Sequence, residues 1–182
     1  TSKRFNTEAR RFVQALAAEL RRRRIEVVVG NAYDVWNYFR PHRTYGIAMA
    51  VDFFHDHADG CSLTLNRVCP VLTRDFAYNL SNHYDILMPQ IRWRSFTFVD
   101  SYDRQWYRFF NRVSAEVKLI IYPATLTNEG DMDAYQNAKV DIIKVFADEI
   151  LRCLRSNYNY NAYAKAAKAA RIRINEIMKR NG

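Results

Sequence analysis

The clearest pattern in the chain lies in residues 44–68, which read TYGIAMAVDFFHDHADGCSLTLNRV. Apolar residues alternate with small or polar ones in residues 47–53, and the alternation returns in residues 61–66. A period of two is typical of a strand with one buried face. The residues between the two arms are mostly polar and end in Gly60, which favours a turn. We therefore predict a long β-hairpin over residues 44–68.

Further segments could extend this hairpin into a sheet. β-branched and aromatic residues, which favour strands, recur in residues 25–29, 91–99, 106–110 and 113–121. The last three segments follow one another closely, as in an antiparallel meander over residues 91–122. The predicted fold is therefore α+β, with an antiparallel sheet of about four to six strands.

Helical periodicity marks both ends of the chain. Apolar residues recur three and four positions apart in residues 7–23, 31–40, 70–82, 131–155 and 162–179. This spacing places them on one face of a helix. We expect the N-terminal helix and the two C-terminal helices to cover the sheet. Residues 1–156 would form the core domain, and residues 157–182 a basic helix packed on it or appended to it.

Composition limits the class of protein. A chain of 182 residues, 49% of them hydrophobic, is long enough to bury a core. It has no apolar run of about 18 residues, so we expect no membrane span, and its N-terminus shows no apolar secretory segment. Three cysteines without a CxxC pair argue against a disulfide framework. We expect an intracellular protein, cytoplasmic or associated with a nucleoid or virion.

The strongest global signal is a formal net charge of +9. Such a charge favours a phosphate-rich partner, and nucleic acid is the most common one. Aromatic rings among cations would stack bases while the cations hold phosphates. We therefore predict a nucleic-acid-binding protein. Its candidate contact residues are Arg21, Arg22, Arg23, Arg24, Arg92, Arg94, Arg104, Trp106, Arg108, Lys165, Lys168 and Arg171.

Each basic group also has a structural interpretation. Consecutive arginines suit the C-terminal end of a helix, where cations are favourable. Arginines on a strand can extend into solvent around buried aromatic residues. The alanine-rich C-terminal helix can pack through its apolar side. An alternative function is therefore that of a viral or other structural assembly subunit, which forms homo-oligomers.

The predicted turn also gathers candidate metal ligands. Imidazoles and carboxylates fall close together at Asp52, His55, His57 and Asp59, with Asp56 among them. Such side chains can hold a divalent cation. With Tyr160 as a nucleophile, His55 and His57 would complete a metal-dependent nuclease, which is our second alternative. An exposed polar loop explains the same residues. We expect no cofactor other than a divalent metal at this turn.

No other motif names a reaction. Asp85, Gln90 and Arg92 loosely follow a nuclease pattern, but arginine does not readily lose a proton to act as a base. The chain contains neither a phosphate-binding P-loop nor a serine in a nucleophile elbow. The residues do not distinguish DNA from RNA or single from double strands, and they do not indicate the oligomeric state. We identify no family.

Overall fold

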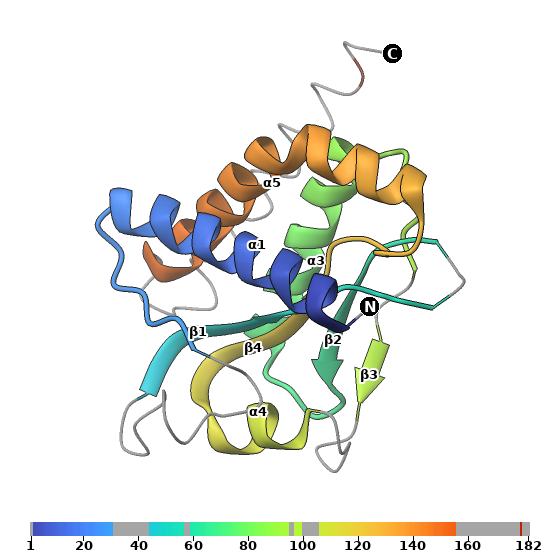
Figure 1. The fold of residues 1–182 in the computed structure, drawn as a ribbon. Coiled ribbons are helices and arrows are strands. Elements are labelled where there is room, and N and C mark those ends of the chain that lie inside the picture. Colours follow the sequence, from blue (N-terminus) through green and yellow to red (C-terminus); the bar gives the residue numbers. More distant parts are fainter. Residues whose placement is uncertain are drawn as a thin grey trace.

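The computed structural model describes residues 2–30, 44–56, 59–94, 97–99, 106–155 and 179. The helix predicted over residues 31–40 lies outside these residues, and so does the helix predicted over residues 162–179 except for Lys179. The described elements are α1 (Ser2–Arg22), β1 (Thr44–Val51), β2 (Ser62–Asn66), α3 (Val71–Leu87), β3 (Thr97–Val99), α4 (Tyr107–Arg112), β4 (Ser114–Tyr122) and α5 (Glu129–Arg155) (Figure 1). None of these helices is long and apolar enough to cross a membrane.

The described strands form one mixed sheet in the order β1-β4-β2-β3. β4 is parallel to β1 and antiparallel to β2, and β2 is parallel to β3. The α+β class is therefore confirmed. The prediction of a purely antiparallel sheet is wrong.

The predicted hairpin is also wrong, because β4 lies between its two arms. β4 carries the consecutive residues Leu119, Ile120 and Ile121, which are at most 2% exposed. A continuous apolar run is typical of a strand that is covered on both faces. Alternation correctly located β1 and β2, but it carries no information about which strand lies next to which.

The predicted meander over residues 91–122 is wrong as well. Residues 106–110, predicted as a strand, begin helix α4. Trp106, Phe109, Phe110 and Val113 are all at most 3% exposed, and their spacing is that of one helix face. Aromatic content suggested a strand here, whereas the spacing of the aromatic residues indicates a helix.

The two remaining predicted strands are shorter than expected or missing. Within residues 91–99, the described part forms only β3 and an isolated bridge between Trp93 and Cys61. Residues 25–29 form no strand. The helices predicted over residues 7–23, 70–82 and 131–155 are present as α1, α3 and α5, with somewhat different ends.

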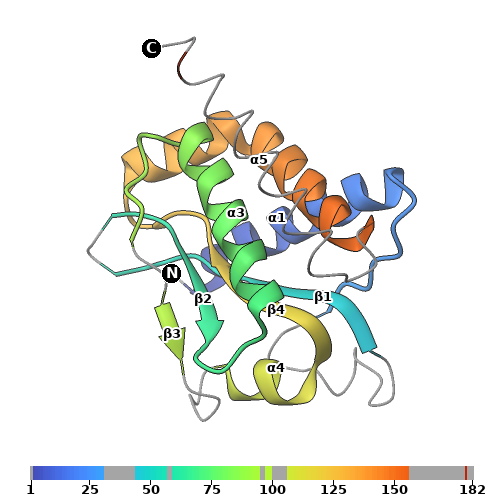
Figure 2. The same cartoon turned by 180° about the vertical axis from the view of Figure 1, so that it is seen from behind.

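The sheet separates two unequal cores. Figures 1 and 2 show α1, α3 and α5 on one side of the sheet and α4 on the other. The larger core includes Phe12 from α1 and Phe146 from α5, whose ring centroids are 5.4 Å apart. The smaller core packs α4 against Ala48, Ala50 and Ile120. Both faces of β1 and β4 are therefore covered, as a parallel strand pair requires.

A buried carboxylate holds α5 to α3. Glu149 is completely buried, accepts a hydrogen bond from Arg152, and lies 3.7 Å from Nε2 of His83 on α3. Burial, together with the charge of Arg152, lowers the pKa of His83, while Asp148 opposes the shift. Arg152 is therefore the main cation that balances the buried charge of Glu149.

Replacing Glu149 with alanine is expected to lower the free energy of unfolding by about 3 kcal/mol, because Arg152 loses its buried partner. Urea denaturation would measure the change. Asp148→Ala is the matched control. Its carboxylate is largely exposed and its partner Arg23 keeps a second bond to Glu19, so we expect a loss below about 1 kcal/mol. Equal losses in the two variants would contradict the role assigned to Glu149.

Candidate functional site

The candidate site lies where the carboxyl ends of β1 and β4 meet. These strands are parallel, so the residues that follow them emerge at the same edge of the sheet. Ligands of open α/β sheets commonly bind outside the carboxyl ends of the strands. We call this region the carboxyl edge, and define it by the described residues 52–56, 59–61, 92–94 and 122–131.

Backbone hydrogen bonds hold the loops of the carboxyl edge together. The pairing of β1 and β4 continues past the strands, because Phe54 N donates to Ala124 O at 3.1 Å and Leu126 N donates to Phe54 O at 2.7 Å. On the other side, Cys61 N donates to Arg92 O at 2.9 Å and Arg94 N donates to Cys61 O at 2.8 Å. The edge is therefore a bonded framework of three loops.

Asp131 joins two of these loops to the start of α5. It is 4% exposed, and its Oδ2 accepts hydrogen bonds from Gly60 N at 2.7 Å and Thr125 N at 3.2 Å. The hydroxyl of Thr125 donates to Gly60 O at 3.1 Å. Asn128 caps the helix, since its Oδ1 accepts from Asp131 N at 2.9 Å. The buried carboxylate is thus satisfied by backbone donors.

Arg94 neutralises the acidic part of the loop after β1. Its guanidinium donates to both carboxylate oxygens of Asp56 at 2.9 Å and to the Asp59 carbonyl at 2.7 Å. It also reaches the Thr125 hydroxyl at 3.0 Å. Arg92 pairs with the Asp59 carboxylate at 3.0 Å. Two of the acidic side chains predicted near a metal are therefore held by arginine.

An aromatic stack lies beside these ion pairs. The Arg94 guanidinium lies 3.9 Å from the centroid of the Phe54 ring, which stacks on Tyr122 with centroids 4.3 Å apart. The indole Nε1 of Trp106 donates to the Tyr122 hydroxyl at 3.1 Å. The stack connects the end of β1 with the end of β4 and with α4. It fixes the shape of the edge on the α4 side of the sheet.

Asp52 is the residue at this edge best suited to acid–base chemistry. It follows β1 directly, is 5% exposed, and accepts a 3.0 Å hydrogen bond from Phe53 N. Burial raises its pKa to about 6, although the Phe53 hydrogen bond and the charge of His55 oppose the shift. A carboxyl with such a pKa is present in both protonation states near neutral pH, as a general acid or base requires.

The predicted metal site is not formed by the described residues. Among them, no group of three or more His, Cys, Asp or Glu side chains is arranged to hold a metal ion. Asp59 faces Arg92, and His57 lies outside the described part of the chain. The described residues therefore form no three-ligand metal site by themselves, and the divalent metal stays a prediction.

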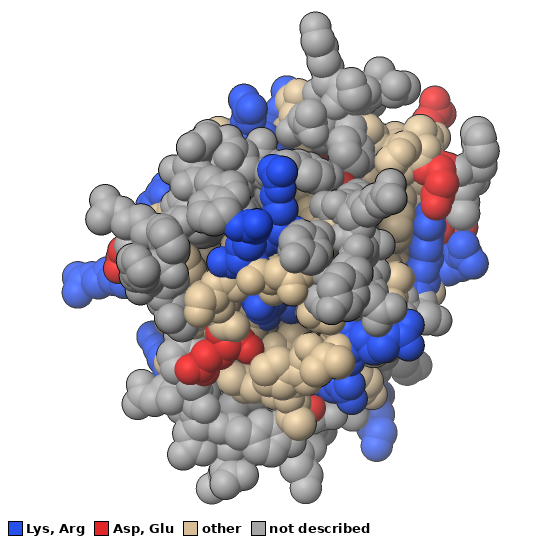
Figure 3. Space-filling model, turned by 90° about the horizontal axis from the view of Figure 1, so that it is seen from below, with Lys and Arg blue, Asp and Glu red and all other residues tan. Residues whose placement is uncertain are grey.

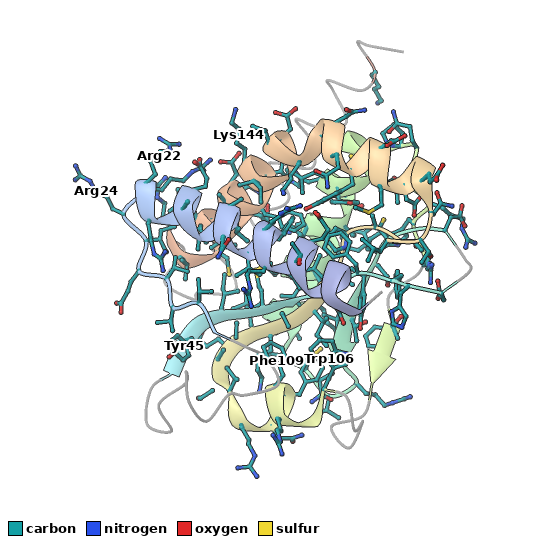
Figure 4. The ribbon with its side chains drawn as sticks, viewed as in Figure 1. Arg22, Arg24, Tyr45, Trp106, Phe109 and Lys144 are labelled. Carbon is teal, nitrogen blue, oxygen red and sulfur yellow. The ribbon has the colours of Figure 1, made fainter. Side chains whose placement is uncertain are left out.

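The predicted nucleic-acid contacts are dispersed. Arg22 and Arg23 pair with Glu19, Arg23 also binds Asp148, and Trp106 is 3% exposed. Figure 4 shows Arg22, Arg24 and Lys144 at the end of the molecule opposite α4. Figure 3 shows Lys and Arg side chains at several separate places on the α4 side, where Asp, Glu and uncharged residues are also visible. Four further nucleic-acid candidates, Arg104, Lys165, Lys168 and Arg171, lie outside the described residues, and so does the candidate nucleophile Tyr160.

Sequence reasoning missed Gly60, Tyr122, Thr125 and Asp131 as members of the site. One local signal was available for part of it. Asn128 and Asp131 stand three residues apart at the start of a helix that follows a strand, a spacing typical of helix capping. Nothing local indicates that Asp131 binds a residue 71 positions earlier.

The fold resembles that of a solved endolysin catalytic domain and of solved N-acetylmuramoyl-L-alanine amidases. The sequence matches no family model, and no curated protein matches it. The catalytic domain of CD27L endolysin targeting Clostridia Difficile superposes with a TM-score of 0.61 and 12% identity, covering 81% of this chain and 83% of that one. The catalytic domain of CwlV, an N-acetylmuramoyl-L-alanine amidase from Bacillus (Paenibacillus) polymyxa var. colistinus, superposes with a TM-score of 0.57 and 9% identity. This match covers 79% of this chain and 81% of that one. The N-acetylmuramoyl-L-alanine amidase AmiC2 of Nostoc punctiforme superposes with a TM-score of 0.53 and 12% identity, covering 79% of this chain and 81% of that one.

These similarities show that the chain has the amidase fold. They contradict our prediction of a nucleic-acid-binding protein with nucleic acid as its partner. They equally contradict the two alternatives, a viral or other assembly subunit and a metal-dependent nuclease. Net charge misled the prediction, because a basic surface indicates the sign of a partner but not its chemical class.

Proposed function

We propose that this chain acts on peptidoglycan as an amide hydrolase, with its reaction centre at the carboxyl edge. The fold shared with several N-acetylmuramoyl-L-alanine amidases supports the substrate class. The observation that carries the proposal is the position of Asp52, a buried carboxyl with a pKa raised to about 6, at the end of a parallel strand.

Hydrolysis of a muramoyl–alanine amide adds water across the bond between the carbonyl carbon and the nitrogen. Ionised Asp52 accepts a proton from the water as the water oxygen attacks the carbonyl carbon. The protonated carboxyl then donates that proton to the departing amine of alanine, and the products are a carboxylic acid and a free amino group. A pKa near 6 makes both transfers accessible near neutral pH.

Binding without hydrolysis is a second candidate function. It is favoured by the pairing of Asp56 with Arg94 and of Asp59 with Arg92, which neutralises two carboxylates at the carboxyl edge. The domain would then retain the fold and recognise the same polymer without cleaving it.

One experiment tests both candidates. The full chain is mixed with purified peptidoglycan, and binding is measured by co-sedimentation. Hydrolysis is measured by the appearance of new alanine amino termini, in parallel reactions with added divalent metal and with a chelator. We expect wild type to sediment and to release amino termini. Asp52→Asn is expected to lower release at least tenfold with sedimentation retained. The control is Asp133→Asn, which replaces an exposed carboxylate on α5 and is expected to behave as wild type.

The outcomes separate the candidates. Sedimentation without new amino termini under any metal condition would establish binding as the function and reject hydrolysis. Release that survives in Asp52→Asn would reject Asp52 as the acid–base group. Neither sedimentation nor release would reject peptidoglycan as the ligand.

A further inference from the structure

Exposed apolar side chains gather at the end of the sheet opposite the carboxyl edge. Because β2 is antiparallel to β4, the end of β2 lies beside the beginning of β4. Figures 1 and 2 show the connection from β2 to α3 at this end, near α4. We call this end the amino edge, and define it by the described residues 66–78 and 108–116.

The connection between β2 and α3 holds two valines in solvent. The hydroxyl of Thr73, in the first turn of α3, donates to the backbone oxygen of Glu116 on β4 at 3.1 Å and fixes that turn to the sheet. Val68 in the connection is nevertheless 87% exposed, and Val71, the first residue of α3, is 57% exposed. The apolar tip is therefore a built part of the fold that no described element covers.

The exposed side chains change in kind along α3. Val71, Arg74 and Tyr78 are spaced three and four residues apart, so they lie on one face of the helix. All three are exposed, Tyr78 by 48%. A rise of about 1.5 Å per residue places Arg74 about 5 Å and Tyr78 about 10 Å from Val71 along the axis. The face is therefore apolar at the tip, cationic after one turn and aromatic after two.

Arg74 supplies a positive charge just above the valines. It donates to the backbone oxygen of Arg67 at 3.4 Å, which is a neutral acceptor, and no carboxylate within the described part of the chain pairs with it. The described residues of the amino edge carry four arginines and two carboxylates, Asp75 and Glu116. Figure 3 views this end and shows Lys and Arg side chains next to uncharged ones. The amino edge therefore favours an anionic partner.

We propose that the amino edge binds the surface of a lipid bilayer with anionic headgroups, with Val68 and Val71 at the boundary of the acyl chains. Interfacial segments bury apolar side chains about 5–10 Å deep. Cations are attracted to anionic headgroups, and tyrosine is enriched at their level. The order of side chains along α3 matches these depths.

Two other partners explain the tip less well. A phosphate-rich polymer would bind the arginines and leave the valines in water. A stable protein contact removes about 800 Å² from each partner, far more than two valines and a tyrosine supply. The inference does not rest on the proposed function. Because the carboxyl edge lies at the other end of the sheet, it stays accessible when the amino edge lies on a bilayer.

Co-sedimentation of the full chain with vesicles tests the inference. Vesicles of phosphatidylcholine mixed with phosphatidylglycerol are expected to sediment the chain, and less so as salt is raised. Val68→Asp and Val71→Asp are each expected to lower the partition coefficient at least tenfold. Aspartate suits the first turn of a helix, so Val71→Asp keeps α3 intact. The control Val140→Asp makes the same charge change at a valine that is 67% exposed on α5, and is expected to stay close to wild type.

A second pair of variants measures the charge. Arg74→Gln is expected to weaken binding to the mixed vesicles about fivefold, the factor that corresponds to about 1 kcal/mol for one cation near an anionic surface. Binding to phosphatidylcholine alone is expected not to change. The control Lys144→Gln removes an exposed cation from α5 and is expected to match wild type on both vesicles.

Several results would overturn the inference. One is a chain that does not sediment with the mixed vesicles, and another is an equal loss in Val68→Asp and Val140→Asp. A wild-type dimer that Val68→Asp dissociates, without vesicle binding, would assign the tip to a second copy of the chain. Loss of peptidoglycan sedimentation in Val68→Asp would assign it to that polymer. Failure of peptidoglycan hydrolysis does not affect vesicle binding, so the two proposals fail separately.

Discussion

Gly60→Ala is expected to lower the free energy of unfolding by about 3 kcal/mol or more. Gly60 has φ +121°, a conformation that residues with a side chain rarely adopt. A Cβ at this position would lie 2.5 Å from the backbone oxygen of Arg92 and 2.8 Å from Cγ of Arg94. The backbone strain and the steric overlap therefore both lower the free energy of unfolding.

The surrounding bonds prevent the backbone from relieving that overlap. Gly60 N is bound by Asp131 and Gly60 O by Thr125. The contacted Arg92 carbonyl accepts from Cys61 N. A shift large enough to accommodate a methyl group would break buried hydrogen bonds, each of which costs about 1–3 kcal/mol when its partner stays unsatisfied.

Gly130→Ala is the matched control, since Gly130 is the second residue of α5. Its nearest neighbour to an added Cβ is Asn128 Oδ1 at 3.4 Å, an ordinary contact. Alanine there is expected to raise the free energy of unfolding by about 0.5–1 kcal/mol, because glycine loses more chain entropy on folding. Urea denaturation of both variants would measure the changes. A Gly60→Ala loss below about 1 kcal/mol would contradict the geometry described for the carboxyl edge.

Local patterns in the sequence predicted which residues form elements, but not how the elements assemble. The period of 3.6 located α1, α3 and α5, because the buried faces of helices are encoded within each segment. Strand order is not encoded in this way. β4 enters the sheet between β1 and β2, although its partners Val51 and Leu63 are tens of residues away in the chain. Only the unbroken apolar run in β4 hinted at a central position.

The candidate site was predictable only in part, because local patterns do not show which distant elements surround a residue. Asp52 stood out because it sits among imidazoles and carboxylates in the sequence. Its raised pKa could not be predicted, because burial by distant elements causes the shift. Arg94 illustrates the limit further. It was predicted to contact phosphate, but it pairs with Asp56, 38 residues earlier, and that pairing depends on the fold.

Asp52→Asn is expected to stabilise the protein at pH 8 and to change its stability little at pH 4. Burial raises the pKa of Asp52 from 3.8 to about 6, so between these values the folded chain binds more protons than the unfolded chain. The contribution of Asp52 to stability therefore falls as pH rises from about 4 to about 6 and stays low above it. Asparagine does not titrate, and its Oδ1 can keep the hydrogen bond from Phe53 N.

The expected gain at pH 8 is up to about 3 kcal/mol, since each pKa unit corresponds to about 1.4 kcal/mol. Urea denaturation of wild type, Asp52→Asn and the control Asp133→Asn across pH 4–8 measures it. The difference between Asp52→Asn and wild type should grow between pH 4 and about 6 and then level off, whereas Asp133→Asn should show no such rise. A difference that is the same at every pH would mean that folding does not shift the Asp52 pKa. Asp52 would then keep an ordinary carboxyl pKa, and it would be a weaker base toward the attacking water than the proposed mechanism requires.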